Sequence, residues 1–127
     1  DRGAGLTYPC LYEWCDVTCW ETAGVVGERK EIYIVESDGT DADAGLGSAD
    51  AAWTDANLKP NMYLIGINTT QVTTGDAKNV KRGTCMINTR YFSVAVWSLS
   101  ATSHLQADNN ANYISFTPII PDIQAAA

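Results

Sequence analysis

Apolar and polar residues alternate over several stretches of this chain, as they do in β-strands. In residues 31–36 (EIYIVE), isoleucines fall on one side of an extended backbone, and Tyr33 and Val35 fall on the other. Longer runs of β-branched and aromatic residues, which favour pleated sheets, span residues 61–72, 84–99 and 112–120. We predict strands in all four stretches, and the expected core positions include Tyr33, Ile65, Val94 and Val96.

Turn-forming residues separate the predicted strands. Gly39, Gly75 and Asn109 mark such turns, and the turns recur at the spacing of a sandwich or small barrel. One stretch, residues 48–58, has the pattern of a short helix. The sequence therefore predicts an all-β fold: a single antiparallel β-sandwich or small barrel, with at most one or two short helices and extended N- and C-terminal segments.

Length and charge restrict the classes of function. The 127 residues suffice for one domain, residues 1–127, and the formal net charge is −7 at pH 7. Binding to nucleic acid depends on Lys and Arg, so an acidic chain is a poor candidate for it. No apolar run approaches the ~20 residues of a membrane-spanning helix. We expect neither a nucleic-acid partner nor a membrane span.

Both ends of the chain are apolar. Residues 1–20 are rich in aromatic residues and cysteine, and we expect an N-terminal arm that must be covered. Residues 117–127 are predicted to form an extended tail, because its two prolines remove backbone donors. The tail must be buried on its own sheet or on a neighbouring subunit. Assembly contacts are therefore predicted at Phe116, Ile119, Ile120 and Ile123.

Cysteine content favours an oxidising compartment, because the number is even and the domain is small. The chain also begins at Asp1 instead of Met, as a processed secreted product would. We predict disulfide bonds, with the remote Cys85 joined to one of three clustered cysteines, although spacing leaves the connectivity open and allows a link between chains. Zinc binding and buried free thiols are the alternatives. The four residues are Cys10, Cys15, Cys19 and Cys85.

Charge is sorted along the chain. Residues 36–55 hold six acidic residues and no Lys or Arg, whereas residues 78–90 hold four basic residues and no acid. These segments are either solvated loops or complementary patches that meet between copies. In the second case, Lys81 and Arg82 would contact a neighbouring subunit.

The acidic stretch also contains a weak candidate for calcium binding. Residues 36–45 (ESDGTDADAG) cluster carboxylates, which hard cations prefer, but they lack the glycine position and the final Glu of a helix–loop–helix site. A looser site would use Asp38, Asp41 and Asp43. We otherwise expect no metal and no cofactor.

Catalytic motifs are sparse. His104 is the only histidine, so a Ser-His-Asp or Cys-His arrangement would have to use it. The chain has neither a nucleophile elbow nor a phosphate-binding glycine motif. We therefore expect a protein without catalytic residues that is not an enzyme.

Two further residues suggest surface roles. Trp53 lies among polar residues and could form a platform for sugar rings. Asn68-Thr69-Thr70 fits the acceptor pattern for N-glycosylation, which matters only in a secreted chain from a source that glycosylates.

These features favour a structural role over catalysis. The leading interpretation is a non-enzymatic subunit of an extracellular or virion assembly, such as a coat or decoration protein or a surface filament subunit. It would self-associate through its terminal segments, as a homo-oligomer or with other subunits of the same assembly. The alternative is a secreted carbohydrate- or receptor-binding β-sandwich module.

Overall fold

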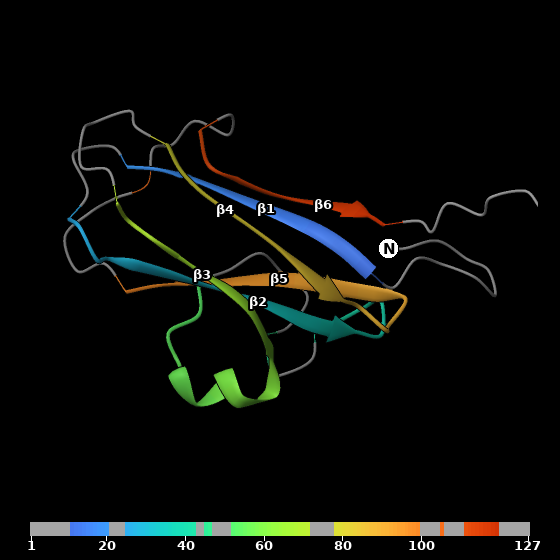
Figure 1. The fold of residues 1–127 in the computed structure, drawn as a ribbon. Coiled ribbons are helices and arrows are strands. Elements are labelled where there is room, and N and C mark those ends of the chain that lie inside the picture. The colour runs from blue at the N-terminus through green and yellow to red at the C-terminus, as the bar shows by residue number, and fades with distance from the viewer. Residues whose placement is uncertain are drawn as a thin grey trace, which may run out of the picture.

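The structure, a computed structural model, describes residues 11–20, 25–42, 45–46, 52–71, 78–99, 105 and 111–119. Within these residues, six strands form two three-stranded antiparallel sheets that pack together (Figure 1). The predicted all-β sandwich is confirmed. One sheet has the strand order β4-β1-β6, with bounds Lys78–Met86, Leu11–Cys19 and Tyr113–Pro118. The other has the order β3-β2-β5, with bounds Tyr63–Thr69, Arg29–Ser37 and Tyr91–Ser98.

The N-terminal segment contains a central strand, which differs from the predicted arm. β1 pairs with β4 along its whole length and with β6 over most of it. Its side chains from Trp14 onward are buried, because neighbouring strands flank it on both sides. The apolar character of residues 11–20 is therefore that of a buried strand. Residues 1–10 and 120–127 lie outside the described residues, and the start of the predicted tail, Thr117 and Pro118, belongs to β6.

Two element boundaries also differ from the prediction. The run 84–99 contributes to two strands, β4 and β5, which are separated by residues 87–90. Residues 48–51 of the predicted helix lie outside the described residues, and the structure has a short 3-10 helix, η1, at Ala56–Asn61, which overlaps only the end of the predicted range. Asp55 caps its start, and the carboxylate of Asp55 accepts the backbone N–H of Asn57 at 2.9 Å. Among the described residues, no helix is long and apolar enough to cross a membrane.

β2 contributes to a hydrophobic cluster on each face of its sheet. Toward the other sheet, Ile34 packs with Tyr12 of β1. On the outer face, Tyr33 and Val35 form a second cluster, against which Leu58 of η1 packs; η1 lies beneath this sheet in Figure 1. A strand that is covered on both faces has a continuous apolar run, as in the residues IYIV of β2.

The predicted core positions have mixed outcomes. Tyr33 is 5% exposed, which confirms its prediction, and Ile65 is half-buried. The predictions for Val94 and Val96 are wrong, because these side chains are 39% and 36% exposed. Both residues lie on β5, which is an edge strand. An edge strand has a neighbour on one side only, so apolar residues in it can remain in contact with solvent.

Trp14 lies between two glycines. Gly83 is its register partner on β4, and Gly66 lies on β3 in the facing sheet. A Cβ atom added at Gly83 would lie 2.8 Å from the indole Cζ2, and one added at Gly66 would lie under 3.0 Å from two ring atoms. The indole is 1% exposed. The absence of side chains at these two positions thus makes room for a large buried ring.

Three cysteines, Cys15, Cys19 and Cys85, are free thiols in the structure, and Cys10 lies outside the described residues. Cys85 lies opposite Tyr12 and packs with the cluster between the sheets. Cys15 is three positions along β1 from Tyr12, so Cys15 and Cys19 point to the opposite face. The predicted bridge from Cys85 to either of them is therefore wrong, because the sheet itself separates the thiols. Burial raises the pKa of the Cys85 thiol.

Candidate functional site

A cluster of polar side chains lies buried between the two sheets. We call it the polar cluster. The side chains of Lys30 and Asp16 are 4% and 0% exposed, and their partners are nearly as deeply buried. The two central strands, β1 and β2, and the edge strands β3 and β4 contribute to it. Its members are Asp16 and Thr18 of β1, Lys30 of β2, Asn68 of β3 and Asn79 of β4.

Asp16 is at the centre of the polar cluster. Lys30 Nζ lies 2.7 Å from Asp16 Oδ1, as an ion pair outside hydrogen-bond geometry. The other carboxylate oxygen, Oδ2, accepts hydrogen bonds from Asn68 Nδ2 at 2.6 Å and from the Thr18 hydroxyl at 2.9 Å. Because desolvation offsets most of the attraction in a buried ion pair, this arrangement adds little net stability by itself. It does hold four side chains in one defined geometry.

Asn68 links the two sheets. It is the register partner of Lys30, and its Nδ2 also donates to the backbone carbonyl of Asn79 at 3.0 Å. The side-chain oxygen of Asn79 in turn accepts the backbone N–H of Gln71 at 2.9 Å. Asn68 is 6% exposed, so the folded chain has no room for a glycan at its amide nitrogen. The Asn68-Thr69-Thr70 motif therefore has a structural role here.

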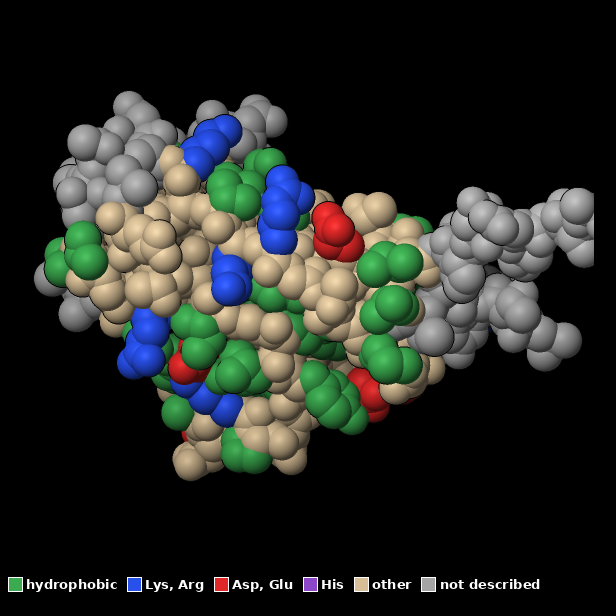
Figure 2. All heavy atoms as spheres, viewed as in Figure 1, with side chains coloured by type: hydrophobic (Ala, Val, Ile, Leu, Met, Phe, Trp, Pro, Cys, Tyr) green, Lys and Arg blue, Asp and Glu red, His purple; other side chains and the backbone are tan. Residues whose placement is uncertain are grey.

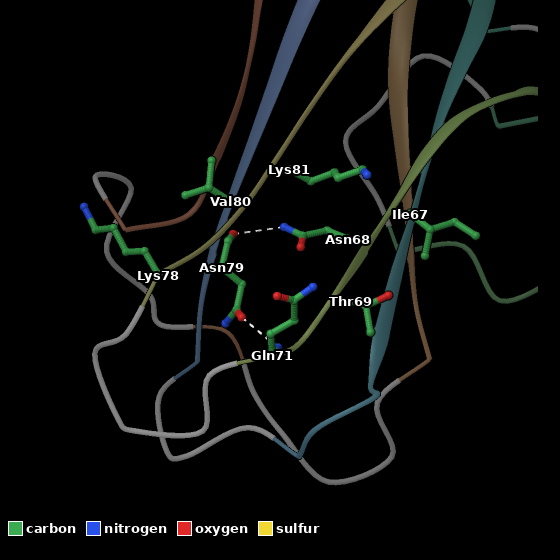
Figure 3. A pocket seen from close by; sticks show the side chains of 8 residues that line it. All are labelled: Ile67, Asn68, Thr69, Gln71, Lys78, Asn79, Val80 and Lys81. Carbon is green, nitrogen blue, oxygen red and sulfur yellow. Dashed lines mark hydrogen bonds between the residues drawn. The ribbon is translucent and has the colours of Figure 1, made fainter.

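A recess of about 200 Å³ opens between β3 and β4 beside the polar cluster (Figure 3). In Figure 3, Asn68 points from β3 toward β4, and Lys81 extends from β4 toward β3. Small polar molecules can therefore approach Asn68 from solvent. The residues lining the recess are Ile67, Asn68, Thr69, Gln71, Lys78, Asn79, Val80 and Lys81.

A second group of polar contacts covers the outer face of the β3-β2-β5 sheet. Lys59 Nζ of η1 lies 2.6 Å from Glu31 Oε2, and the Tyr33 hydroxyl donates to the same oxygen at 2.7 Å. These two hydrogen bonds, that from Lys59 first, hold the pKa of Glu31 below its usual value. Lys59 Nζ also lies 4.3 Å from the centre of the Trp97 ring. These contacts fasten η1 to the sheet.

Tyr33 makes the free energy of unfolding depend on pH in the alkaline range. Burial and the hydrogen bond to Glu31 raise the pKa of Tyr33 from 10.0 to about 12. Its contribution is therefore complete below pH 10 and is lost as pH rises toward 12. We expect the free energy of unfolding to fall by about 2–3 kcal/mol over this range from this group alone. Urea unfolding at several pH values between 10 and 12 measures this change in the free energy of unfolding.

The matched control for this pH effect is Tyr63, whose ring is 61% exposed on β3. Tyr33→Phe should flatten the pH dependence between pH 10 and 12, and Tyr63→Phe should leave it unchanged. An equal slope in wild type and Tyr33→Phe would contradict the assignment.

The predicted ligand residue Trp53 is half-buried beside this group. Its ring centre lies 4.6 Å from that of Trp97 and 6.2 Å from that of Tyr33, both in edge-to-face contact. Trp53 belongs to the aromatic packing over the sheet. Much of its surface is therefore already in contact with protein, although its role in sugar binding stays a prediction.

Two of the three predicted calcium residues, Asp38 and Asp41, lie in one exposed turn. Asp38 Oδ1 accepts the backbone N–H groups of Thr40 at 2.7 Å and Asp41 at 3.1 Å, which lower the pKa of Asp38. The carboxylate thus closes a turn. Asp43 lies outside the described residues. Within the part of the chain that the structure describes, no group of three His, Cys, Asp or Glu residues could hold a metal ion.

The predicted assembly residues lie in different places. Phe116 is half-buried and packs against the cluster between the sheets, with its ring centre 5.5 Å from that of Phe92. Ile119 is 38% exposed. Lys81 lines the recess, and Arg82 is exposed, 3.7 Å from Glu13. The remaining predicted positions, Ile120 and Ile123, lie outside the described residues, as does His104.

The sequence reasoning missed the polar cluster. One signal was available: Asp16 lies in phase with Tyr12 and Trp14 along β1, so a period-2 pattern places a carboxylate on the buried face. A charged residue is rarely buried unless it is paired, which predicts an inward-facing partner such as Lys30. The partner's identity depends on strand pairing, which the pattern does not give.

Comparison with known proteins does not supply a function. No family model, no curated protein and no solved structure gives a significant match to this chain. Function must therefore be inferred from the chemistry and geometry of the residues described above.

Proposed function

We propose that this protein is a non-enzymatic structural subunit of an extracellular or virion assembly that associates with copies of itself. The observation that carries the proposal is a row of exposed apolar side chains across the β4-β1-β6 sheet. We call it the apolar row, and it consists of Met86, Leu11 and Ile119. The alternative is a carbohydrate- or receptor-binding module that uses Trp53. Because Trp53 packs against Trp97, less of its ring is free to contact a ligand than in a fully exposed tryptophan.

The apolar row crosses three strands at one end of the sandwich. Met86 lies opposite Leu11, and the Ile119 N–H donates to the Leu11 carbonyl at 2.9 Å. Their exposed fractions are 64%, 39% and 38% for Met86, Leu11 and Ile119. A second recess, of about 90 Å³, is lined by Met86 together with Tyr63 and other residues. An apolar surface of this kind is a candidate for contact with another protein.

A second copy of this chain is the occupant that we propose for the apolar row. Residues 1–10 and 120–127 continue the chain from this end, and they contain further apolar residues, including Leu6, Tyr8, Ile120 and Ile123. A terminal segment of one copy would bury the row of the next by strand addition or by side-chain packing.

Charge supports a head-to-tail contact. Lys78 and Lys81 lie toward the end of β4 that is remote from Met86. Asp38 follows β2, whose Ile34 packs with Tyr12, so this acidic turn lies at the end that carries the apolar row. Figure 2 shows Lys and Arg side chains on one half of the visible face, and hydrophobic side chains both among them and at the opposite end. Arg90 lies at the acidic end, so the predicted basic segment is divided between the two ends.

Self-assembly can be tested with a variant of the apolar row. We expect full-length protein to form particles larger than a monomer, and Leu11→Ser/Met86→Ser to remain monomeric, because polar side chains remove the apolar contact. Light scattering over a range of protein concentrations measures the particle mass. Raised salt should weaken assembly if the charged ends meet.

Val26 provides the control, because it is 65% exposed in a turn away from the apolar row. Val26→Ser should assemble like wild type. Removal of the chain after Ile119, where β6 is complete, should leave a folded domain with weaker assembly. A wild-type protein that stays monomeric at high concentration would overturn the proposal, as would normal assembly of the double variant.

A further inference from the structure

The polar cluster brings an amine, a carboxamide and a carboxylate together away from water. Lys30 and Asn68 project as register partners from neighbouring strands of one sheet, and Asp16 reaches both of them from the facing sheet. We propose that Lys30 and Asn68 join in an intramolecular amide bond, an isopeptide bond, with Asp16 as the acid and base. This bond forms within one chain, so it is independent of the self-assembly proposed above.

The strand ladder holds the two reacting side chains close together. Directly opposed residues of an antiparallel pair have their Cβ atoms about 4.5–5.5 Å apart, which the side chain of a lysine readily spans. One carboxylate contacts both groups: Asp16 Oδ1 lies 2.7 Å from Lys30 Nζ, and Asp16 Oδ2 lies 2.6 Å from Asn68 Nδ2. Groups held in this way react as parts of one molecule, with a large entropic advantage.

The chemistry of the three groups assigns their roles. The carbon of a carboxylate is a poor electrophile, because the two oxygens share a negative charge, so Asp16 exchanges a proton with the amine. The carboxamide of Asn68 is neutral, and its nitrogen can leave once it is protonated. That nitrogen is the atom against Asp16 Oδ2. Lys30 is therefore the nucleophile, Asn68 the electrophile, and Asp16 the catalytic residue that moves protons.

The reaction balances without an oxidant or any other reactant. Lys30 transfers a proton to Asp16 across their contact, which removes two buried charges and leaves a neutral amine. The nitrogen lone pair attacks Asn68 Cγ, and the carbonyl π electrons move to the oxygen. Asp16 protonates Nδ2, the bond from Cγ to Nδ2 breaks, and its electron pair leaves with ammonia. The carbonyl re-forms, and Nζ passes one of its two protons to the ammonia, which leaves as ammonium, while the other proton stays on the secondary amide. Overall, a lysine ammonium and a carboxamide become a secondary amide and an ammonium ion.

The surroundings of Asp16 fit this proton transfer. The carboxylate is 0% exposed, so water does not compete for the proton. The Thr18 hydroxyl donates to Oδ2 at 2.9 Å and fixes the orientation of the carboxylate. Thr18 is thus a positioning residue. Asn68 also borders the recess between β3 and β4 in Figure 3, which gives the released ammonia a route to solvent.

Mass spectrometry of the full-length, denatured wild-type chain tests the proposal directly. We expect a mass lower than that of the sequence by one ammonia molecule. After proteolysis, a single branched product should contain the peptide of Lys30 joined to that of Asn68. Succinimide formation at an asparagine also releases ammonia, and the branched product distinguishes the two reactions.

Substitutions then test each role. Lys30→Met removes the nucleophile, and Asp16→Asn keeps the shape of the side chain but abolishes proton exchange; both chains should have their full calculated mass. Lys59→Met is the matched control, because Lys59 forms an ion pair with Glu31 on the outer face, and it should retain the deficit of one ammonia. The wild-type measurement requires no variant to fold.

Three results would overturn the proposal. One is a folded wild-type chain of full calculated mass. Another is a deficit that persists in Lys30→Met, which would assign the loss to an asparagine elsewhere. The third is a deficit of one water with Lys30 joined to Asp16, which would make the carboxylate the electrophile and exclude the roles assigned here.

Discussion

Gly66→Ala should destabilise the protein by about 3 kcal/mol, the upper part of the usual range for overpacking a core. The added methyl group would lie under 3.0 Å from two ring atoms of Trp14. The indole is 1% exposed and has Gly83 on its own sheet as a second close neighbour, so it has little room to move. Urea unfolding measures the change in the free energy of unfolding.

Two further variants separate the steric clash from other effects of alanine. Gly27 has a positive φ of 92° and open space around its Cα, so Gly27→Ala reports backbone strain alone, about 1–2 kcal/mol. In a Trp14→Leu background the smaller side chain should accept the new methyl group, so Gly66→Ala should cost less there than in wild type. Equal costs in the two backgrounds would show that Trp14 is not what the methyl group meets.

Ile32→Asp should prevent folding, whereas Val96→Asp should be tolerated. The two residues are register partners on the same face of one sheet, but Ile32 is 0% exposed on the central strand and Val96 is 36% exposed on the edge strand. An aspartate at position 32 would be a buried charge, and nearby Lys30 is already engaged by Asp16. We expect a loss of at least about 5 kcal/mol for Ile32→Asp and of about 1 kcal/mol for Val96→Asp.

Circular dichroism and urea unfolding of the two variants check this contrast, because both introduce the same side chain. If both chains unfold, then β5 is covered more completely than its exposed fractions indicate. If both remain folded, then the assignment of β2 as the central strand is wrong.

Local pattern predicted β2, β3, β5 and β6, but it did not predict the central strand β1, most of β4, or which strands lie side by side. Alternation predicted β2 correctly, and the structure shows that the strand is covered on both faces. The exposure of Val96 was not predictable, because central and edge strands can have the same composition. The difference arises from sheet order, which depends on contacts between distant residues. The same limit explains Phe116, which was predicted as an assembly contact and packs, half-buried, against the cluster between the sheets.

The faces on which the cysteines lie, and the members of the polar cluster, could not be predicted because they depend on the register between strands. Cys15 and Cys85 lie on adjacent strands, yet they point to opposite faces, and a shift of one residue in pairing would reverse that result. Likewise, Lys30 and Asn68 meet only because β2 and β3 pair with these two residues opposed. Lys30 belongs to no recognisable local motif, and the motif around Asn68 indicates glycosylation instead of a contact with Lys30. Chemistry that depends on a pairing across 38 positions is invisible to a reading of short windows of sequence.

The pairing of β1 with β6 has a mechanical consequence. The strands are antiparallel, and Leu11 at the start of one lies beside Ile119 just past the end of the other. Tension applied between these two points would open the ladder one residue pair at a time, like a zipper, instead of shearing many hydrogen bonds at once. The β3-β2-β5 sheet would bear none of that load. A fibre of such subunits would resist stretching better if force entered β4 near Lys78 and left β1 near Leu11, because that load would shear the ladder between the two strands.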